Sequence, residues 1–289
     1  MSISIYPDQL APGGPLPEMK GVFVTATDTE VGKTVIAGAI ARSLRNDGVR
    51  IEVFKPAASG CRHDRGQLVS EDAEFLAACA DSKRPLHEIA PLRYSAALAP
   101  NVAAQRAGRS VDIEHMLEAY RRLEGACDAV VVEGVGGLLC PISDDLWVVN
   151  LAVMLALPVV IVARPDLGTI NHTLLTIQAA RSAGLHVAGV IINRYQIDPH
   201  KTDLSGPDDE IAMLTNPAQI AEKGKVRVLS LVPDDKETSV SKSRLGKGVS
   251  FAIDQIDWKK IGGVGKGSVR LRSETPNQVA QGQRKRSSS

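Results

Sequence analysis

The sequence predicts an α/β fold in which a mainly parallel central sheet is covered by helices on both faces. Short aliphatic runs alternate with segments of helical periodicity along the 289 residues, and strands separated by helices imply parallel crossover connections. Aromatic residues make up only 3% of the chain and hydrophobic residues 44%. The core is therefore expected to be aliphatic, which suits strands that are buried on both faces.

The strands are expected at six short apolar runs: Gly21–Thr25, Ile51–Phe54, Ala129–Glu133, Pro158–Ala163, Val187–Ile192 and Val226–Val232. Apolar residues at helical spacing predict helices from about Lys33 to Asn46, from Ile113 to Leu123 behind the cap Asp112, and from about Thr169 to Ala183. Polar or Gly-rich residues follow five of the strands. Because the carboxyl ends of parallel strands meet at one edge, we expect the active site there.

The folded domain is expected over residues 20–261. Residues 1–19, rich in Pro and Gly, are expected to be a flexible extension, and the basic Gly- and Ser-containing residues 262–289 a disordered tail. From Val240 to the end there are eleven Lys or Arg against three Asp or Glu, whereas the whole chain has a net charge of +1. This segment has almost no aromatic residues for stacking on bases, so we expect a solvated tail and no nucleic-acid partner.

No apolar run reaches the roughly eighteen residues that would cross a bilayer, so no membrane partner is expected. No basic patch leads into an apolar stretch near the first residue, as a secretory signal would require. The four cysteines have no metal-type spacing and are expected to be reduced thiols: Cys61, Cys79, Cys127 and Cys140. These features predict a cytoplasmic protein.

A phosphate-binding loop is the strongest motif in the chain. The strand Gly21–Thr25 enters a loop that ends in Gly32-Lys33-Thr34 and opens a helix, so that backbone N–H groups and Lys33 face phosphate oxygens and Thr34 is placed to ligate Mg²⁺. The regular pattern has Gly where Thr27 stands, so the loop reads as one residue longer, with Ala26 at its start. The predicted fold is thus a P-loop NTPase-type sandwich, and its nucleotide-binding residues are Thr27, Asp28, Thr29, Glu30, Val31, Gly32, Lys33, Thr34 and Val35.

Charged residues at two other strand ends are expected in the same cleft. Glu133 ends a strand before a Gly-rich loop, where P-loop enzymes hold magnesium. Lys55 follows another strand and would place positive charge against a transferring phosphoryl group. Asp72 lies at a predicted helix start, where a magnesium-binding role and a role as helix N-cap are equally open. The segment Asp166–His172 opens a further helix, whose free N–H groups suit an anion such as a carboxylate; His172 alone is more typical of a structural residue.

Taken together, these segments resemble the dethiobiotin synthase family. The resemblance rests on Thr27-Asp-Thr-Glu-Val-Gly-Lys-Thr34, Lys55-Pro-Ala-Ala-Ser-Gly60, Asp72, Val132-Glu-Gly-Val-Gly-Gly137, Leu167-Gly-Thr-Ile-Asn-His172 and Val190-Ile-Ile-Asn193. The matching segments occur in the same order as in the family and cover residues 21–194, and weaker similarity continues to about Trp258. It implies a ligase that uses ATP and Mg²⁺ to join CO₂ to 7,8-diaminononanoate and close a cyclic urea, working as a homodimer.

The resemblance also implies a role for individual residues. Lys33, Lys55 and Thr29 would be catalytic, and Thr34, Asp72 and Glu133 would hold the metal. Asn193, Pro233 and Asp234 would surround the adenine. Ser59 and Gly136 would face the diamine and carbamate, and the helix start at Gly168, Thr169 and Asn171 would bind the substrate carboxylate across the dimer interface. Family members usually have Gly at Ala26; a left-handed backbone there would cost Ala about 1 kcal/mol.

Two other functions are compatible with a P-loop α/β chain. One is an ATPase switch of the chromosome-partition or septum-positioning type, but such proteins carry an extra lysine early in the loop, and residues 25–31 contain none. The other is an amide-forming ATPase of cobalamin synthesis, which usually carries a glutaminase domain that the residues after Arg194 are too few to hold. The ligase is the favoured interpretation.

Overall fold

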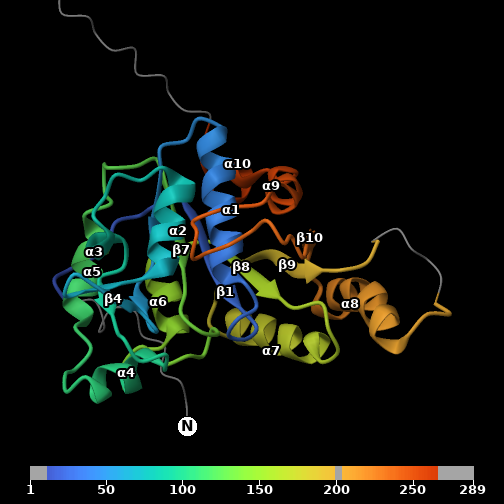
Figure 1. Cartoon of the computed structure of the whole chain (residues 1–289), viewed down its shortest axis with the longest axis horizontal. Helices are drawn as coiled ribbons and strands as arrows, with labels where there is room; N and C mark the ends of the chain where they lie inside the picture. Colours follow the sequence, from blue (N-terminus) through green and yellow to red (C-terminus); the bar gives the residue numbers. More distant parts are fainter. Residues whose placement is uncertain (1–11, 199–203, 266–289) are drawn as a thin grey trace, which may run out of the picture.

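A computed structural model describes residues 12–198 and 204–265 of the chain. Its centre is a six-stranded, wholly parallel sheet (Figure 1). In spatial order the strands are β10 (Val228–Pro233), β9 (Val187–Tyr195), β8 (Val159–Ala163), β1 (Gly21–Ala26), β7 (Ala129–Glu133) and β2 (Ile51–Phe54). The strand that enters the P-loop therefore lies inside the sheet, where it is fully buried.

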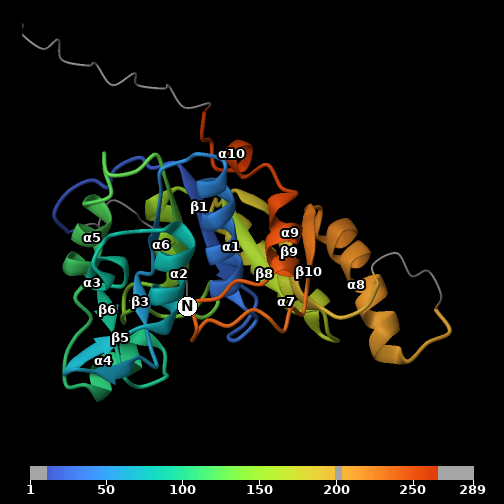
Figure 2. The ribbon, with the colours of Figure 1, turned by 45° about the horizontal axis from the view of Figure 1, so that its top comes forward.

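The helices cover both faces of this sheet, as the sequence predicts. One face carries α1 (Lys33–Asn46), α2 (Glu71–Ala80), α9 (Lys247–Asp254) and α10 (Trp258–Ile261), and Figure 2 shows α1 and α9 on the same side of the sheet. The other face carries α5 (Ile113–Arg121), α6 (Val148–Leu155), α7 (Thr169–Ser182) and α8 (Asp208–Gly224). None of the helices in the described ranges is long and apolar enough to cross a bilayer.

The alternation of side chains along each strand explains how both faces of the sheet are buried. In β1, Phe23 packs into the core beneath α5 to α8, whereas Val22 and Val24 pack into the core beneath α1. The same alternation divides β8, with Ile161 on one side and Val160 on the other. Side chains of successive strand residues point to opposite faces, so near-continuous aliphatic runs fill two cores at once.

The predicted elements all occur, with shifts of one to three residues at some ends. The helix behind Asp112 is real, and the Asp112 side chain accepts a hydrogen bond from the His115 backbone N–H at 2.9 Å. The largest shift is in β9, which continues to Tyr195 rather than ending at Ile192. The polar residues after Ile192 have low strand propensity, so the sequence does not predict them as part of the strand. Pairing with β10 nevertheless keeps residues 193–195 in the sheet.

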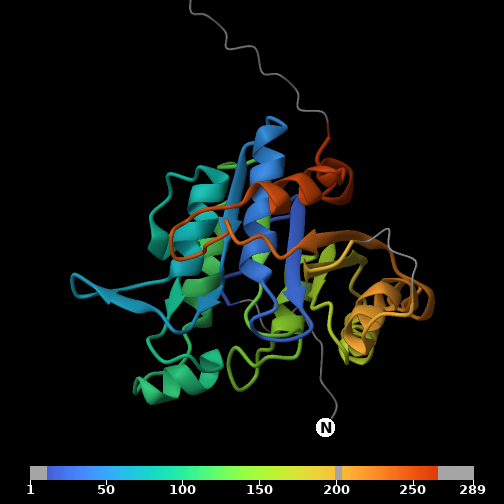
Figure 3. The same ribbon diagram turned by 45° about the vertical axis from the view of Figure 1, so that its right-hand side comes forward.

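Several short elements were not predicted. Two of them, β3 (Ala57–Ala58) and β6 (Leu92–Arg93), form a small parallel pair, and β4 (Arg62–Asp64) and β5 (Gln67–Val69) form an antiparallel hairpin that projects from the body in Figure 3. The short helices α3 (Leu86–Ile89) and α4 (Pro100–Arg106) lie in the same part of the chain. Elements of this length carry too little periodicity to be recognised in a sequence.

The predicted terminal segments lie only partly in the described ranges. Of residues 1–19, only 12–19 are described, and the guanidinium of Arg121 donates hydrogen bonds to the carbonyls of Pro12 and Gly14. At the other end, the Gly262 carbonyl accepts a hydrogen bond from the Gly21 N–H at 2.9 Å. The basic residues from Lys266 onwards lie outside the described residues.

Candidate active site

The P-loop geometry follows from two residues with left-handed backbone, Glu30 at φ 58° and Gly32 at φ 93°. Gly32 is the N-cap of α1, and a Cβ there would lie 2.1 Å from Asn193 Nδ2, so only glycine fits. No side chain caps this helix, so its first N–H groups are left for a ligand. Ala26 is the last residue of β1 and is not among the residues with positive φ, so alanine is not strained there.

Four side chains from four different segments meet beside the loop. Thr34 Oγ1 donates to Asp72 Oδ1 at 3.0 Å and lies 2.9 Å from Glu133 Oε1. Lys55 Nζ donates to Asp72 Oδ2 at 2.7 Å and to Glu133 Oε1 at 2.5 Å. We call Thr34, Lys55, Asp72 and Glu133 the ion-pair cluster. It forms because β2 and β7 are neighbours in register, Phe54 opposite Val132, so that the next residue of each chain segment reaches the same point.

Burial decides the electrostatics of this cluster. Lys55 is 4% exposed and Glu133 is fully buried. Burial alone would lower the pKa of Lys55, but the carboxylates of Glu133 and Asp72 outweigh it and raise the pKa above its usual value. Burial would likewise raise the pKa of Asp72, and the charge of Lys55 reverses the shift, so the pKa of Asp72 is lowered. The Lys55 ammonium and the Asp72 carboxylate are therefore held charged.

Lys33, the lysine of the P-loop, is buried like Lys55 but has no ion-pair partner within hydrogen-bond distance in the described structure. Lys33 is 8% exposed, and its Nζ has one hydrogen bond in the described structure, to the Asp28 carbonyl at 3.4 Å. Burial lowers the pKa of Lys33, and the charges of Glu133 and Asp72 offset this effect only in part. A cation that is desolvated and poorly paired gains most when an anion binds.

Asn193 meets the loop from the other side. At the end of β9, its Nδ2 donates to the Val31 carbonyl at 2.9 Å. Asn193, Thr29 and Glu30 line a cavity of about 340 Å³, together with residues 164–166. Asp234 follows β10, and its N–H donates to the Tyr195 carbonyl, two residues beyond Asn193. The predicted adenine-binding residues thus lie on adjacent strand ends.

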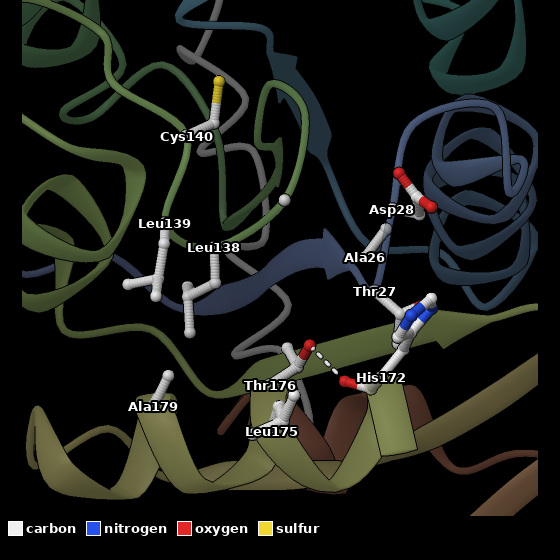
Figure 4. A pocket seen from close by; sticks show the side chains of 11 residues that line it. Ala26, Thr27, Asp28, Leu138, Leu139, Cys140, His172, Leu175, Thr176 and Ala179 are labelled. Atoms are coloured by element: carbon white, nitrogen blue, oxygen red, sulfur yellow. Dashed lines mark hydrogen bonds between the residues drawn. The ribbon is translucent and has the colours of Figure 1, made fainter. Parts of the chain in front are cut away.

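A second cavity, of about 360 Å³, opens where the P-loop begins (Figure 4). In Figure 4, Thr27 lies beside His172 on α7, Asp28 follows it in the loop, and Leu138, Leu139 and Leu175 supply an apolar wall. This cavity has one polar end and one apolar end. It suits an elongated ligand with a polar reacting group and an aliphatic chain.

The sequence of this chain is similar to those of known proteins. A family model described as "AAA domain" matches residues 20–241. The ATP-dependent dethiobiotin synthetase BioD of Anaeromyxobacter sp. (strain K) is 40% identical over 228 residues, which cover 79% of this chain and 96% of that protein. The enzyme of the same name from Bacillus subtilis (strain 168) is 36% identical over 234 residues, covering 79% and 100%. The chain belongs to the dethiobiotin synthetase family.

Among solved structures, the MinC:MinD cell division protein complex from Aquifex aeolicus matches with a TM-score of 0.50 and 16% identity. The match covers 81% of this chain and 91% of that one. At this identity the likeness shows a shared P-loop ATPase fold and nothing about partners.

The residues expected to bind metal in a dethiobiotin synthetase fit a magnesium ion. They offer two carboxylates and a hydroxyl, which are the hard oxygen ligands that Mg²⁺ prefers. Glu133 Oε2 is buried and has no hydrogen-bond partner among the described residues. A group of three or more His, Cys, Asp or Glu side chains suited to a metal is absent from the described ranges.

The structure also answers the alternative left open for Asp72. Ser70 is the N-cap of α2, and its Oγ accepts a hydrogen bond from the Ala73 N–H at 3.2 Å. Asp72 lies in the first turn and points into the ion-pair cluster instead. The capping interpretation of Asp72 is therefore wrong, because a serine two residues earlier already takes that place.

Other predicted residues lie at the same edge without joining the cluster. No hydrogen bond in the described structure links Ser59, which follows β3, to Lys55. Gly136 has φ 60°, and a Cβ there would lie 2.9 Å from Cys140 Sγ. Gly168 is the N-cap of α7, and Thr169 is buried behind it.

Sequence reasoning missed two sets of residues at this edge. The apolar wall of Leu138, Leu139 and Leu175 carries no local signal, since leucines are common in any helix or loop. Arg164 is different. It directly follows β8, and the rule that selected Lys55 after its strand would have selected Arg164 as well.

Proposed function

We propose that this chain is an ATP-dependent dethiobiotin synthetase, a ligase that makes a cyclic urea from 7,8-diaminononanoate and CO₂. One amine adds to CO₂ and loses a proton to give a carbamate. A carbamate oxygen attacks the γ-phosphorus of ATP, and ADP leaves. The second amine then attacks the carbonyl carbon of this carbamic-phosphoric anhydride, phosphate leaves, and the ring closes. The observation that supports this most strongly is the buried cation Lys55 beside the P-loop, in a chain of this family.

The two lysines act on the charge that develops during phosphoryl transfer. Lys33 faces the phosphates from the start of α1, and Lys55 faces the carbamate and the γ-phosphoryl group from the end of β2. Both cations are placed in advance by the sheet, so little reorganisation is needed at the moment of reaction. Thr29, at the outer turn of the loop, positions the reacting oxygens. No covalent nucleophile is required.

Nucleotide and substrate occupy adjoining parts of the edge. The triphosphate lies along Thr27 to Val35, and Asn193, Pro233 and Asp234 hold the adenine. Ser59 and Gly136 border the reacting amines, and the cavity shown in Figure 4 accommodates the aliphatic chain. The substrate carboxylate binds at the α7 N-terminus, at Gly168, Thr169 and Asn171. A bound Mg²⁺, held by Thr34, Asp72 and Glu133, would supply further positive charge to the phosphate oxygens.

An assay of the purified chain tests the proposal directly. With ATP, Mg²⁺, bicarbonate and 7,8-diaminononanoate, we expect ADP release that depends on the diamine, because the carbamate is the phosphoryl acceptor. ADP by coupled assay and the cyclic urea by mass spectrometry should form in equal amounts. ADP release at the same rate without the diamine would contradict the ligase function.

The active unit is proposed to be a homodimer in the cytoplasm. All four cysteines are free thiols, as expected in a reducing compartment. Three exposed leucines lie around α7 and the cavity beside it: Leu139 at 44%, Leu167 at 82% and Leu175 at 61%. Exposed apolar side chains gathered at one place are typical of a protein interface. The α7 N-terminus would then serve a substrate in the other protomer.

Charged side chains at this surface are expected to separate the dimer. The double variant Leu167→Glu/Leu175→Glu should be monomeric at micromolar concentration, since it places charges in a desolvated interface. Multi-angle light scattering gives the mass directly. Phe251→Glu is the matched control, because Phe251 is 71% exposed on α9, on the opposite face of the sheet from α7. A monomeric native chain, or a dimer that survives the double change, would refute the proposed interface.

A further inference from the structure

In the proposed reaction the first amine loses a proton as it becomes a carbamate, and the ion-pair cluster is not suited to accept that proton. Its two carboxylates, Asp72 and Glu133, accept hydrogen bonds from Lys55 at 2.7 and 2.5 Å and are the proposed metal ligands. Lys55 itself is held charged, and an ammonium group has no acceptor. A base placed beside the amine would speed this step by about 10²- to 10⁴-fold.

Three residues that line the cavity of about 360 Å³ can exchange a proton: Asp28, Cys140 and His172. Asp28 Oδ1 already accepts a hydrogen bond from the Thr29 N–H at 2.7 Å, and a carboxylate is a weak base near neutral pH. Burial raises the pKa of the Cys140 thiol, so little of the basic thiolate is present. His172 remains, and histidine is the side chain best suited to exchange a proton near neutral pH.

The ring of His172 is available to a ligand. The residue is half-buried near the start of α7, and its ring nitrogens have no hydrogen-bond partner among the described residues. The sequence alone favours a structural role for His172, but a ring with such a role would be expected to have a partner. In Figure 4 the ring lies beside Thr27, whose hydroxyl is buried and has no partner in the described structure either. Two polar groups at this end of the cavity are therefore left for a ligand.

The polar end of the cavity is also where the proposed function places the reacting amine. The cavity begins at Ala26 and Thr27, where the P-loop leaves β1, and it includes Gly137, which follows the Gly136 proposed to border the amines. The wall of leucines then receives the aliphatic chain. An amine at the polar end lies between the P-loop and His172, within the space that a base has to share with its substrate.

We propose that His172 is a catalytic residue that takes a proton from the diamine when its amine adds to CO₂. This assignment rests on the proposed function and extends it by naming the base. The lone pair of the neutral amine forms the N–C bond, and one C=O electron pair of CO₂ moves onto oxygen. An N–H bond then breaks, its electrons stay on nitrogen, and the proton passes to the unprotonated ring nitrogen of His172. The imidazolium releases this proton to solvent, since the ring is only half-buried.

The pH dependence of His172→Gln tests the assignment, because glutamine fills a similar space but cannot take up a proton near neutral pH. At pH 7 we expect kcat to fall about 10²-fold, the lower end of what a general base contributes. The KM values of the diamine and of ATP should stay within about threefold, since the base acts in the chemical step. At pH 9 the deficit in kcat should shrink to about fivefold, because hydroxide and buffer then replace the base.

Rescue by an added base gives a second test. In His172→Ala, imidazole can enter the space left by the ring, and at about 50 mM it should restore part of the turnover while leaving native turnover unchanged. Both variants should keep the native melting temperature, because the ring has no hydrogen bond to lose in the described structure. His186→Gln is the matched control, since His186 is exposed and precedes β9 at the opposite end of the sheet. Its kcat and pH profile should equal those of the native enzyme.

Two results would overturn the role of His172. One is a His172→Gln variant that keeps more than about a third of the native kcat at pH 7, and the other is a deficit of the same size at pH 7 and pH 9. Either result, together with native formation of the cyclic urea, would refute this assignment and leave the proposed function standing. A native chain that releases ADP but forms no cyclic urea from the diamine would instead refute the proposed function, and the role of His172 with it.

Discussion

Lys55→Met is expected to abolish turnover and to destabilise the fold at the same time. Loss of this cation should lower kcat by about 10³-fold, because it faces the oxygens on which charge develops. It also leaves Glu133 buried and without its counter-charge. Removing one partner of a buried ion pair typically costs about 3–5 kcal/mol of unfolding free energy, so the midpoint of urea unfolding should fall clearly.

A second substitution separates the two effects. In Lys55→Met/Glu133→Gln the fully buried charge of Glu133 is removed as well, and the carboxylate that remains, Asp72, is partly exposed to solvent, with 35% of its side chain accessible. The double variant should recover most of the stability lost in Lys55→Met but none of the turnover. Both quantities are measured on the same preparations, by urea unfolding and by diamine-dependent ADP release. If the single variant retains native stability, Lys55 is not the counter-charge of Glu133 in solution.

The members of the ion-pair cluster can be predicted from the sequence, but their contacts with one another cannot. Lys55, Asp72 and Glu133 can each be selected from the sequence as polar residues beside strands or at a helix start. Their pairing depends on β2 lying next to β7, and strand order is a property of the whole fold. For this reason the sequence indicates that Lys55 is in the cleft but not that it is buried between two carboxylates. Its effect on stability follows only from the structure.

Helix α8 gives a second example, because Pro217 lies inside it. A proline within a helix removes one N–H and leaves the carbonyl four residues earlier without its donor. Here that carbonyl belongs to Met213, and the hydroxyl of Tyr195 donates to it at 3.0 Å. The tertiary contact from β9 satisfies the carbonyl that the proline leaves free. Nothing in the local sequence around Pro217 shows this, whereas the P-loop is recognisable because all of its parts are consecutive.

Lys33→Met is expected to remove turnover without any loss of stability, in contrast to Lys55→Met. Lys33 and Lys55 are both buried lysines of the same site, but their pKa values are shifted in opposite directions. The lowered pKa of Lys33 means that burial disfavours its charged form in the folded chain, so at neutral pH this charge opposes folding. Its removal should leave the urea midpoint unchanged or higher, while kcat falls about 10³-fold.

The comparison between the two lysine variants is itself the test. Lys33 has one long hydrogen bond to the protein and faces the phosphates of a bound nucleotide, whereas Lys55 is ion-paired in the folded structure without any ligand. Nucleotide binding, measured by calorimetry with a non-hydrolysable ATP analogue, should therefore be weakened far more by Lys33→Met than by Lys55→Met. A clear drop in the stability of Lys33→Met would show that Lys33 has a structural partner in solution. The opposite pKa shifts of Lys33 and Lys55 would then not lead to opposite effects on the stability of the fold.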